Sequence, residues 1–362
     1  MKRNSSIELL RILSMFAIVI HHYGVHGTLD CMNFSAKYAQ TLKINLFLNF
    51  LGKLGVVLFV MIGAYFLCEK RFKYRRPVNL ILTMAFYSFG LFLVLRYWFP
   101  TDAATDLPWL NVWLPFPLPS GYWFIYAYIF MLLMMPGLNL VIKHFAGKKL
   151  NLLIFCIIIM WSLIPLGINL LNGKPDTSAD FFGYSIGGYF LLIYLVSAAI
   201  RESKLFKSLK FTAVGAVLSV LLVVIICAMM DSKTSFNVLF ALFQLNSPLI
   251  LLVATFIFSF FKNLTFHSRI INFLAGSMFG VYLIHEDSFV RPLIWQQLIS
   301  SIKVAGSPSA YLHQAVTYSL LVFCVCVLID IVVRRLLFSK LINKLTEWIS
   351  KALEKLTAKV LN

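Results

Sequence analysis

Charged residues are scarce in this sequence, and its cysteines show none of the spacings that build a disulfide framework or a zinc site. Only 13% of the 362 residues are charged, and Asp and Glu together number 14. The six cysteines have neither paired nor metal-type spacing, so neither kind of site is indicated. Internal repeats, low-complexity tracts and a soluble domain are not evident either. These shortages argue against a water-soluble or disulfide-stapled protein.

Long apolar runs make up much of the sequence. Hydrophobic residues make up 60% of the chain, and the mean hydropathy is +0.85. Several runs approach or exceed the length of a membrane-spanning helix. We therefore predict an all-α polytopic membrane protein with about ten spans. The expected spans are about 7–27, 44–67, 78–99, 121–141, 150–171, 182–200, 211–230, 237–261, 270–286 and 314–336.

The net charge of +18 could suggest a nucleic-acid partner, but the positions of the basic residues argue against one. Lys and Arg lie mainly in loops on alternate sides of the predicted spans, which is the positive-inside pattern. Residues 69–77, EKRFKYRRP, form the most basic loop and mark the cytoplasmic side. Residues 100–121 contain two Asp, no Lys or Arg and several prolines, which predicts a rigid outer loop. Both termini are expected in the cytoplasm.

Two parts follow from this pattern: a ten-span membrane domain over residues 1–337 and a basic tail over 338–362. In the tail, apolar residues recur at helical spacing while lysines occupy the other faces. Such an amphipathic helix is expected to lie on the inner membrane surface, where simple anchoring would explain it. The apolar residues are Leu341, Leu345, Trp348, Ala352, Leu356 and Val360.

The first span carries ionisable groups that a bilayer makes costly. Arg11 and His22 are eleven residues apart, which returns to within about 20° of the same helix face and separates them by roughly 16–17 Å along the axis. A cation near one surface and an imidazole deep inside suggest an elongated ligand lying along this helix. Alternatively, Arg11 snorkels beside Glu8 and His22 is a packing histidine. His21 points about 100° away and is expected to be structural.

Five stretches, in this order along the chain, resemble membrane-bound acyltransferase family 3. The first is Arg11 followed by ten residues and His22, with Glu8 three residues before the Arg. The other four are LGKLGVVLFVMIGAYFL at 51–67, RFKYRR at 71–76, GYWFIYAYIFMLLMMP at 121–136 and FGVYLIHE at 279–286. One departure is Gly63-Ala64, where the family has Ser-Gly. Close helix packing survives there, but a hydroxyl is lost.

The resemblance implies that an acyl group, usually acetyl, moves from cytoplasmic acyl-CoA to an extracytoplasmic sugar hydroxyl, with no metal. His22 would be the general base or would form a transient acyl-imidazole, and Glu8 would assist at the catalytic end or orient Arg11. The guanidinium of Arg11 suits the phosphates of CoA. The resemblance alone assigns the same role to further arginines of the basic loop, which anionic lipid headgroups would also explain. These are Arg71, Arg75 and Arg76.

Further polar and aromatic residues are candidates for the acceptor site. Lys53 lies among apolar residues of the second span and should face the bundle interior, paired with a carboxylate or near substrate. Trp123, Tyr126 and Tyr128 could stack on a sugar, although an interfacial aromatic belt explains them nearly as well. His285 and Glu286 could orient the acceptor or form a hydrated helix end.

The leading prediction is therefore an O-acyltransferase of a cell-surface polysaccharide or its lipid-linked precursor, in a bacterial plasma membrane. Its partners would be acyl-CoA, the glycan acceptor and the lipid bilayer, and not nucleic acid. A polysaccharide polymerase or ligase is an alternative, but it should have a large outer loop rich in Arg, His or Asp. A transporter using Glu8, Arg11 and His22 as a relay is another, but it should show an internal repeat or paired broken spans. Neither feature is clear in the sequence.

Overall fold

The computed structural model describes residues 4–28, 39–98, 122–172, 185–229, 233–299 and 304–361. Within these ranges the chain is helical and contains no strand, so the all-α class is confirmed. Seven helical stretches in these ranges are long and apolar enough to cross a membrane by length and composition, and shorter apolar helices accompany them. The protein is thus a multi-pass membrane protein. The predicted proline-rich outer loop at 100–121 lies outside the described residues.

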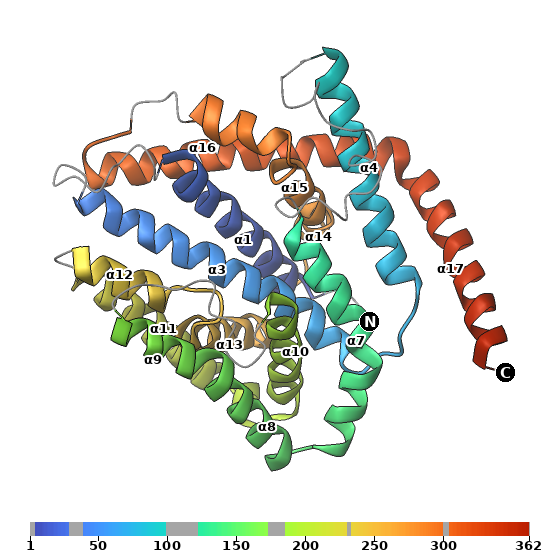
Figure 1. Cartoon of the computed structure of the whole chain (residues 1–362), viewed down its shortest axis with the longest axis horizontal. Helices are drawn as coiled ribbons and strands as arrows, with labels where there is room; N and C mark the ends of the chain where they lie inside the picture. Colours follow the sequence, from blue (N-terminus) through green and yellow to red (C-terminus); the bar gives the residue numbers. More distant parts are fainter. Residues whose placement is uncertain are drawn as a thin grey trace.

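The helices follow the predicted spans closely and are labelled in Figure 1. Up to residue 202 the helices are α1 (Ser5–His22), α3 (Ala39–Leu67), α4 (Arg75–Trp98), α7 (Trp123–His144), α8 (Lys148–Ile158), α9 (Ile164–Asn172) and α10 (Ile186–Glu202). The remainder of the chain contains α11 (Leu209–Ala228), α12 (Lys233–Leu242), α13 (Pro248–Asn263), α14 (Arg269–Ala275), α15 (Met278–His285), α16 (Pro308–Ile329) and α17 (Ser339–Leu361).

Helices α1 and α3 run side by side through the middle of the bundle (Figure 1). Two glycines of α3 allow this close approach. A Cβ atom at Gly52 would lie 2.2 Å from Cβ of His21, and one at Gly55 would lie 2.5 Å from the carbonyl oxygen of Ser14. Small residues at such positions let helix backbones approach closely. His21, in the last turn of α1, therefore lies directly against α3.

The start of α1 is hydrogen-bonded to α14 and to the loop between α13 and α14. The backbone N–H of Ser5 donates to the carbonyl oxygen of Phe266 at 3.1 Å, and the Ser5 hydroxyl donates to Oδ1 of Asn272 at 2.9 Å. The side chain of Asn4 caps the helix by accepting from the N–H of Ser6 at 3.2 Å, as N-cap residues do. These contacts fix how deep Arg11 and His22 lie in the bundle.

Two predicted spans are broken, a feature that is not clear from the sequence. The span expected at 237–261 divides into α12 and α13. Ser247 caps α13 by accepting from the N–H of Leu249 at 3.2 Å, with Pro248 in the first turn, because Pro suits that position. The span expected at 270–286 divides into α14 and α15 at Gly276 and Ser277. This second break places α15 well inside the bundle.

The tail forms the helix α17, which continues from α16 through a π-helical stretch, Asp330–Phe338. One face packs on α4, where the amide of Asn79 donates to the hydroxyl of Thr346 at 3.3 Å. The opposite face exposes apolar side chains, among them Trp348, which is 70% exposed. This two-sided pattern is that of the predicted amphipathic helix. Its placement on the inner membrane surface and the division of the chain at residue 337 stay predictions.

Candidate active site

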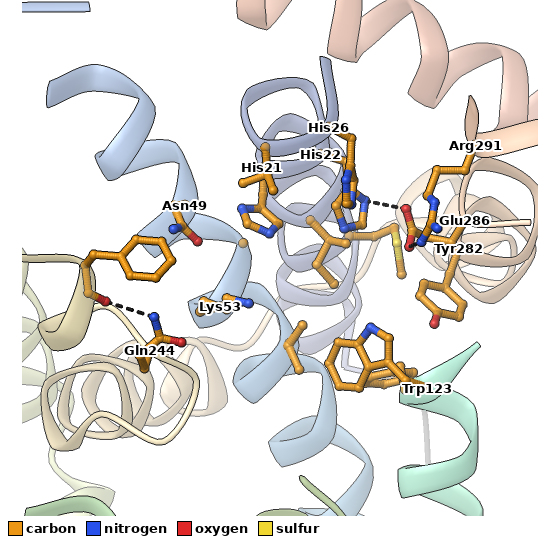
Figure 2. A pocket seen from close by; sticks show the side chains of 17 residues that line it. His21, His22, His26, Asn49, Lys53, Trp123, Gln244, Tyr282, Glu286 and Arg291 are labelled. Carbon is orange, nitrogen blue, oxygen red and sulfur yellow. Dashed lines mark hydrogen bonds and ion pairs between the residues drawn. The ribbon is translucent and has the colours of Figure 1, made fainter. Parts of the chain in front are cut away.

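A cavity of about 310 Å³ lies where the end of α1 meets α3, α7 and α15. Figure 2 shows the side chains around it, with the histidines of α1 on one side and Trp123 of α7 on another. The volume falls at the lower end of the range for small-ligand sites. The polar and aromatic residues that line it include His21, His22, His26, Asn49, Lys53, Trp123, Gln244, Tyr282, Glu286 and Arg291.

His22 is the centre of a buried polar cluster. Its Nδ1 lies 3.1 Å from Nε2 of His285 and 3.0 Å from Oε1 of Glu286, the contact dashed in Figure 2. The second carboxylate oxygen of Glu286 lies 3.7 Å from Nη1 of Arg291. His285 and Glu286 are 0% and 2% exposed, so the predicted alternative of a hydrated helix end is wrong. The break before α15 carries this pair into the bundle interior.

The hydrogen-bond pattern assigns the tautomers of the two histidines. Nδ1 of His285 lies 2.6 Å from the carbonyl oxygen of Val281, which only accepts, so this nitrogen carries the proton and Nε2 has a lone pair. Nδ1 of His22 then faces two acceptors, the Nε2 of His285 and the carboxylate of Glu286, and it must carry a proton as well. The lone pair of His22 is therefore on Nε2. An imidazole held in this way is arranged as a general base.

The turn after α15 holds Glu286 in place. Oδ1 of Asp287 accepts from the N–H of Phe289 at 3.0 Å, and Oδ2 lies 2.8 Å from the hydroxyl of Tyr122. The same hydroxyl donates to the carbonyl oxygen of Leu283 at 2.9 Å. Burial raises the pKa of Asp287 to about 6, because a carboxylate loses solvation there.

Several buried polar atoms at the outer cavity have no hydrogen-bond partner. They are Nδ1 of His21, Oδ1 of Asn49 and the hydroxyl of Tyr282. Lys53 also reaches this cavity, and no carboxylate among the described residues pairs with it. Unpaired buried polar groups are costly. The set would be satisfied by a ligand that carries several hydroxyl or carbonyl groups.

Two further cavities continue from the outer one along α1. The middle cavity, about 280 Å³, shares Phe124 with the outer cavity. It shares Arg11, Gly63, Leu80 and Tyr128 with the inner cavity of about 510 Å³. Three neighbouring cavities with shared wall residues therefore form a row from His22 to Arg11. Nη1 of Arg11 pairs with the carboxylate of Glu8 at 2.9 Å, so the structure places Glu8 with Arg11 and apart from His22.

The basic loop contributes unequally to the inner cavity. Arg75 and Arg76 line it, as does Lys70. Arg71 does not line it; its backbone carbonyl accepts from Nη1 of Arg76 at 3.1 Å. Asn343 of α17 also lines this cavity. The tail is therefore part of its wall, which the sequence pattern does not reveal.

The other predicted residues also differ in whether they line a cavity. Trp123 lines the outer cavity, whereas Tyr126 does not. His21, expected to be structural, lines the outer cavity. Its ring crosses to the face of α1 that meets α3. Residues that sequence reasoning missed are His26, Asn49, Gln244, Tyr282 and Arg291.

Two of the missed residues could have been predicted from the sequence, because each lies four residues from a predicted site residue. His26 follows His22 by four residues, and Asn49 precedes Lys53 by four, so each shares a helix face with a predicted site residue. Gln244 and Arg291 carry no such signal, because only the tertiary fold brings them to the cavity.

The departure at Gly63 has a structural counterpart in Tyr128. A Cβ atom at Gly63 would lie 2.1 Å from the Tyr128 hydroxyl oxygen. The space beside residue 63, where the family's serine would place its side chain, therefore holds the tyrosine hydroxyl. Tyr128 lines both the middle and the inner cavity, so a hydroxyl is still present at this point of the row.

Comparison with known proteins gives one match. The family model described as an acyltransferase domain, that of acyltransferase family 3, matches residues 4–331. This range includes all lining residues of the outer and middle cavities and all those of the inner cavity except Asn343, and it ends near the start of the stretch that leads into α17. No curated protein matches the chain, and no solved structure does.

Proposed function

Because this chain belongs to acyltransferase family 3, we propose that it transfers an acyl group, usually acetyl, from cytoplasmic acyl-CoA to a hydroxyl group. The acceptor would be an extracytoplasmic cell-surface polysaccharide or its lipid-linked precursor, at a bacterial plasma membrane. One observation carries this proposal. A row of cavities leads from a basic entrance at Arg11, Arg75 and Arg76 to the buried imidazole of His22.

The donor would lie along α1. Guanidinium groups bind phosphate oxygens in a bidentate manner, so Arg11, Arg75 and Arg76 would hold the phosphates of CoA at the inner cavity. The pantetheine arm would extend through the middle cavity and past Phe124. The distance of roughly 16–17 Å between Arg11 and His22 along a helix matches an extended arm, which would bring the thioester to the outer cavity.

The acceptor hydroxyl would be activated by His22. Nε2 of His22 takes the hydroxyl proton as the oxygen attacks the thioester carbonyl carbon, and the carboxylate of Glu286 stabilises the resulting imidazolium. The ammonium group of Lys53 would stabilise the oxyanion of the tetrahedral intermediate. The C–S bond then breaks, and the thiolate of CoA takes the proton from His22. In the alternative route, His22 itself attacks the thioester and carries the acyl group before transfer.

The acceptor would occupy the part of the outer cavity whose polar atoms have no partner. Nδ1 of His21, Oδ1 of Asn49 and the hydroxyl of Tyr282 would pair with sugar hydroxyl groups, and Trp123 would stack on the apolar face of a ring. This arrangement supports a glycan better than an apolar acceptor, because an apolar acceptor would leave these groups unpaired.

Transfer from labelled acetyl-CoA tests this proposal. Purified protein would be incubated with radiolabelled acetyl-CoA and extracted cell-envelope glycan, while free CoA and labelled glycan are measured. Wild type is expected to release CoA and label the glycan. Arg11→Gln should raise the KM for acetyl-CoA at least tenfold, whereas Arg269→Gln, which changes an exposed arginine, should not. If wild type neither binds nor turns over acyl-CoA with any acceptor, the proposal fails and a transporter becomes the leading interpretation.

A further inference from the structure

We propose that His22, His285 and Glu286 also form a binding site for a divalent transition-metal ion such as Zn²⁺, and that the bound ion stops acyl transfer. One ligand atom from each residue lies within 4.8 Å of the other two. Two imidazoles and one carboxylate are a ligand set that such ions prefer. Metal binding here depends only on the geometry, whereas the effect on transfer rests on the proposed function.

The first argument is a shortage of protons in the cluster. Nε2 of His285 and Oε1 of Glu286 both face Nδ1 of His22, at 3.1 and 3.0 Å. Nδ1 of His22 carries at most one proton, and one N–H cannot serve two acceptors well. Oε1 of Glu286 is buried without a hydrogen bond. A metal ion placed among the three atoms would replace that proton and coordinate Nδ1 of His22, Nε2 of His285 and Oε1 of Glu286 at once.

The second argument is the support that each ligand already has. A histidine that binds a metal typically donates its other N–H to a carbonyl or carboxylate. Nδ1 of His285 does so toward Val281 at 2.6 Å, which leaves its Nε2 free to coordinate. The second oxygen of Glu286 faces Arg291 at 3.7 Å, a partner that orients the carboxylate. Both ligands are therefore held in the form that coordination requires.

The spacing and the access of the site also fit a small metal ion. Bonds of about 2.0–2.1 Å in a tetrahedral zinc site put ligand atoms roughly 3.3 Å apart, so the observed 3.0 and 3.1 Å need to widen by only a few tenths of an ångström. The cluster opens on the outer cavity through His22 and Glu286. The ring of His26 lies 5.1 Å from that of His22, near enough to approach the fourth position beside a water molecule.

Coordination and base catalysis exclude one another. Coordination through Nδ1 of His22 requires the proton to leave this nitrogen and, in the neutral ring, to move to Nε2. Nε2 then has no lone pair with which to accept the acceptor's proton. Lys53 and Arg291 add positive charge around the cavity, which weakens the binding of a cation. We therefore expect a reversible inhibitor site rather than a permanently filled one.

Co²⁺ is the probe that tests the site directly, because its visible absorption reports both binding and geometry. Purified protein without acyl-CoA would be titrated with Co²⁺, and Zn²⁺ would then be added as a competitor. Wild type is expected to bind one ion with the intense absorption of a tetrahedral or five-coordinate site. Glu286→Gln and His285→Ala should weaken binding at least tenfold, because loss of even an outer-shell partner costs about 10- to 100-fold. His267→Ala, a change at an exposed histidine, should bind as wild type.

The outcomes separate this inference from the proposed function. No bound ion in wild type, or equal affinity in all four proteins, overturns the metal site whatever the transfer activity. Far-UV circular dichroism and thermal melting check that each variant is folded, and the isosteric Glu286→Gln keeps the test valid if His285→Ala does not fold. Zn²⁺ should stop transfer by wild type, and a chelator should restore it. Full transfer by protein that holds Zn²⁺ at this site would overturn the inhibitory role.

Discussion

Replacing Glu286 by glutamine should slow acyl transfer without weakening the binding of acyl-CoA. Oε1 of Glu286 lies 3.0 Å from Nδ1 of His22, and the contact becomes an ion pair when Nε2 of His22 takes a proton. Like a hydrogen bond to a charged group, this ion pair would contribute about 1.5–3 kcal/mol, which corresponds to a loss of about 10- to 150-fold in kcat. The inner cavity, where Arg11 lies, is unchanged by this substitution.

The assay follows CoA release at saturating glycan over a range of acetyl-CoA concentrations, for wild type, Glu286→Gln, His22→Ala and the double variant. Because Glu286 acts through His22, the double variant should be no slower than His22→Ala alone. Glu286→Asp keeps the charge at a shorter reach and should recover part of the rate. A kcat for Glu286→Gln within twofold of wild type would refute the reasoning, as would a further tenfold loss in the double variant.

Three further predictions concern other parts of the molecule. Arg11→Lys keeps the positive charge but loses the planar guanidinium group that binds two phosphate oxygens. The KM for acetyl-CoA should therefore rise about tenfold, or about 1.4 kcal/mol, with little change in kcat. An unchanged KM would contradict a phosphate contact. Gly63→Ala places a Cβ 2.1 Å from the Tyr128 hydroxyl oxygen and should lower the free energy of unfolding by about 1–3 kcal/mol. The melting temperature should fall, and adding Tyr128→Phe in the same chain should restore it. No recovery would argue against this contact. Burial raises the pKa of Asp287 from its ordinary 3.8 to about 6 in the folded protein. The contribution of Asp287 to the free energy of unfolding is therefore most favourable below pH 3.8. It falls by about 3 kcal/mol as the pH rises through 6. The melting temperature of wild type should therefore fall relative to Asp287→Asn between pH 4 and 7, and parallel curves would contradict the burial argument.

The helices could be predicted because the length of an apolar run and the alternation of basic loops are local features of the sequence. The breaks at Ser247-Pro248 and at Gly276-Ser277 were missed because the hydropathy stays high across both. The first had a usable signal, since a serine followed by proline is typical of a helix start. The tail was predicted as an amphipathic helix, but its contact with α4 through Asn79 depends on tertiary packing.

The site was predicted where its residues share one helix face. Arg11 and His22 lie at the two ends of the row of cavities, as the spacing of eleven indicates. The contact of Glu286 with His22 could not be predicted from periodicity, because α15 comes from a distant part of the chain. Arg71 and Tyr126 were predicted from residue type and resemblance alone, and neither lines any of the three cavities described above.

The most direct test of the account is the role of His22 in moving the acyl group. Wild type, His22→Gln and His267→Gln would be incubated with radiolabelled acetyl-CoA and acceptor glycan, with acetyl-CoA binding measured in parallel. The account predicts that His22→Gln binds acetyl-CoA as wild type does but loses at least 100-fold in transfer, while His267→Gln transfers normally; label retained on the wild-type protein alone would indicate the acyl-histidine route. Transfer by His22→Gln within tenfold of wild type would contradict the account, because no base or nucleophile would then be missing from the outer cavity.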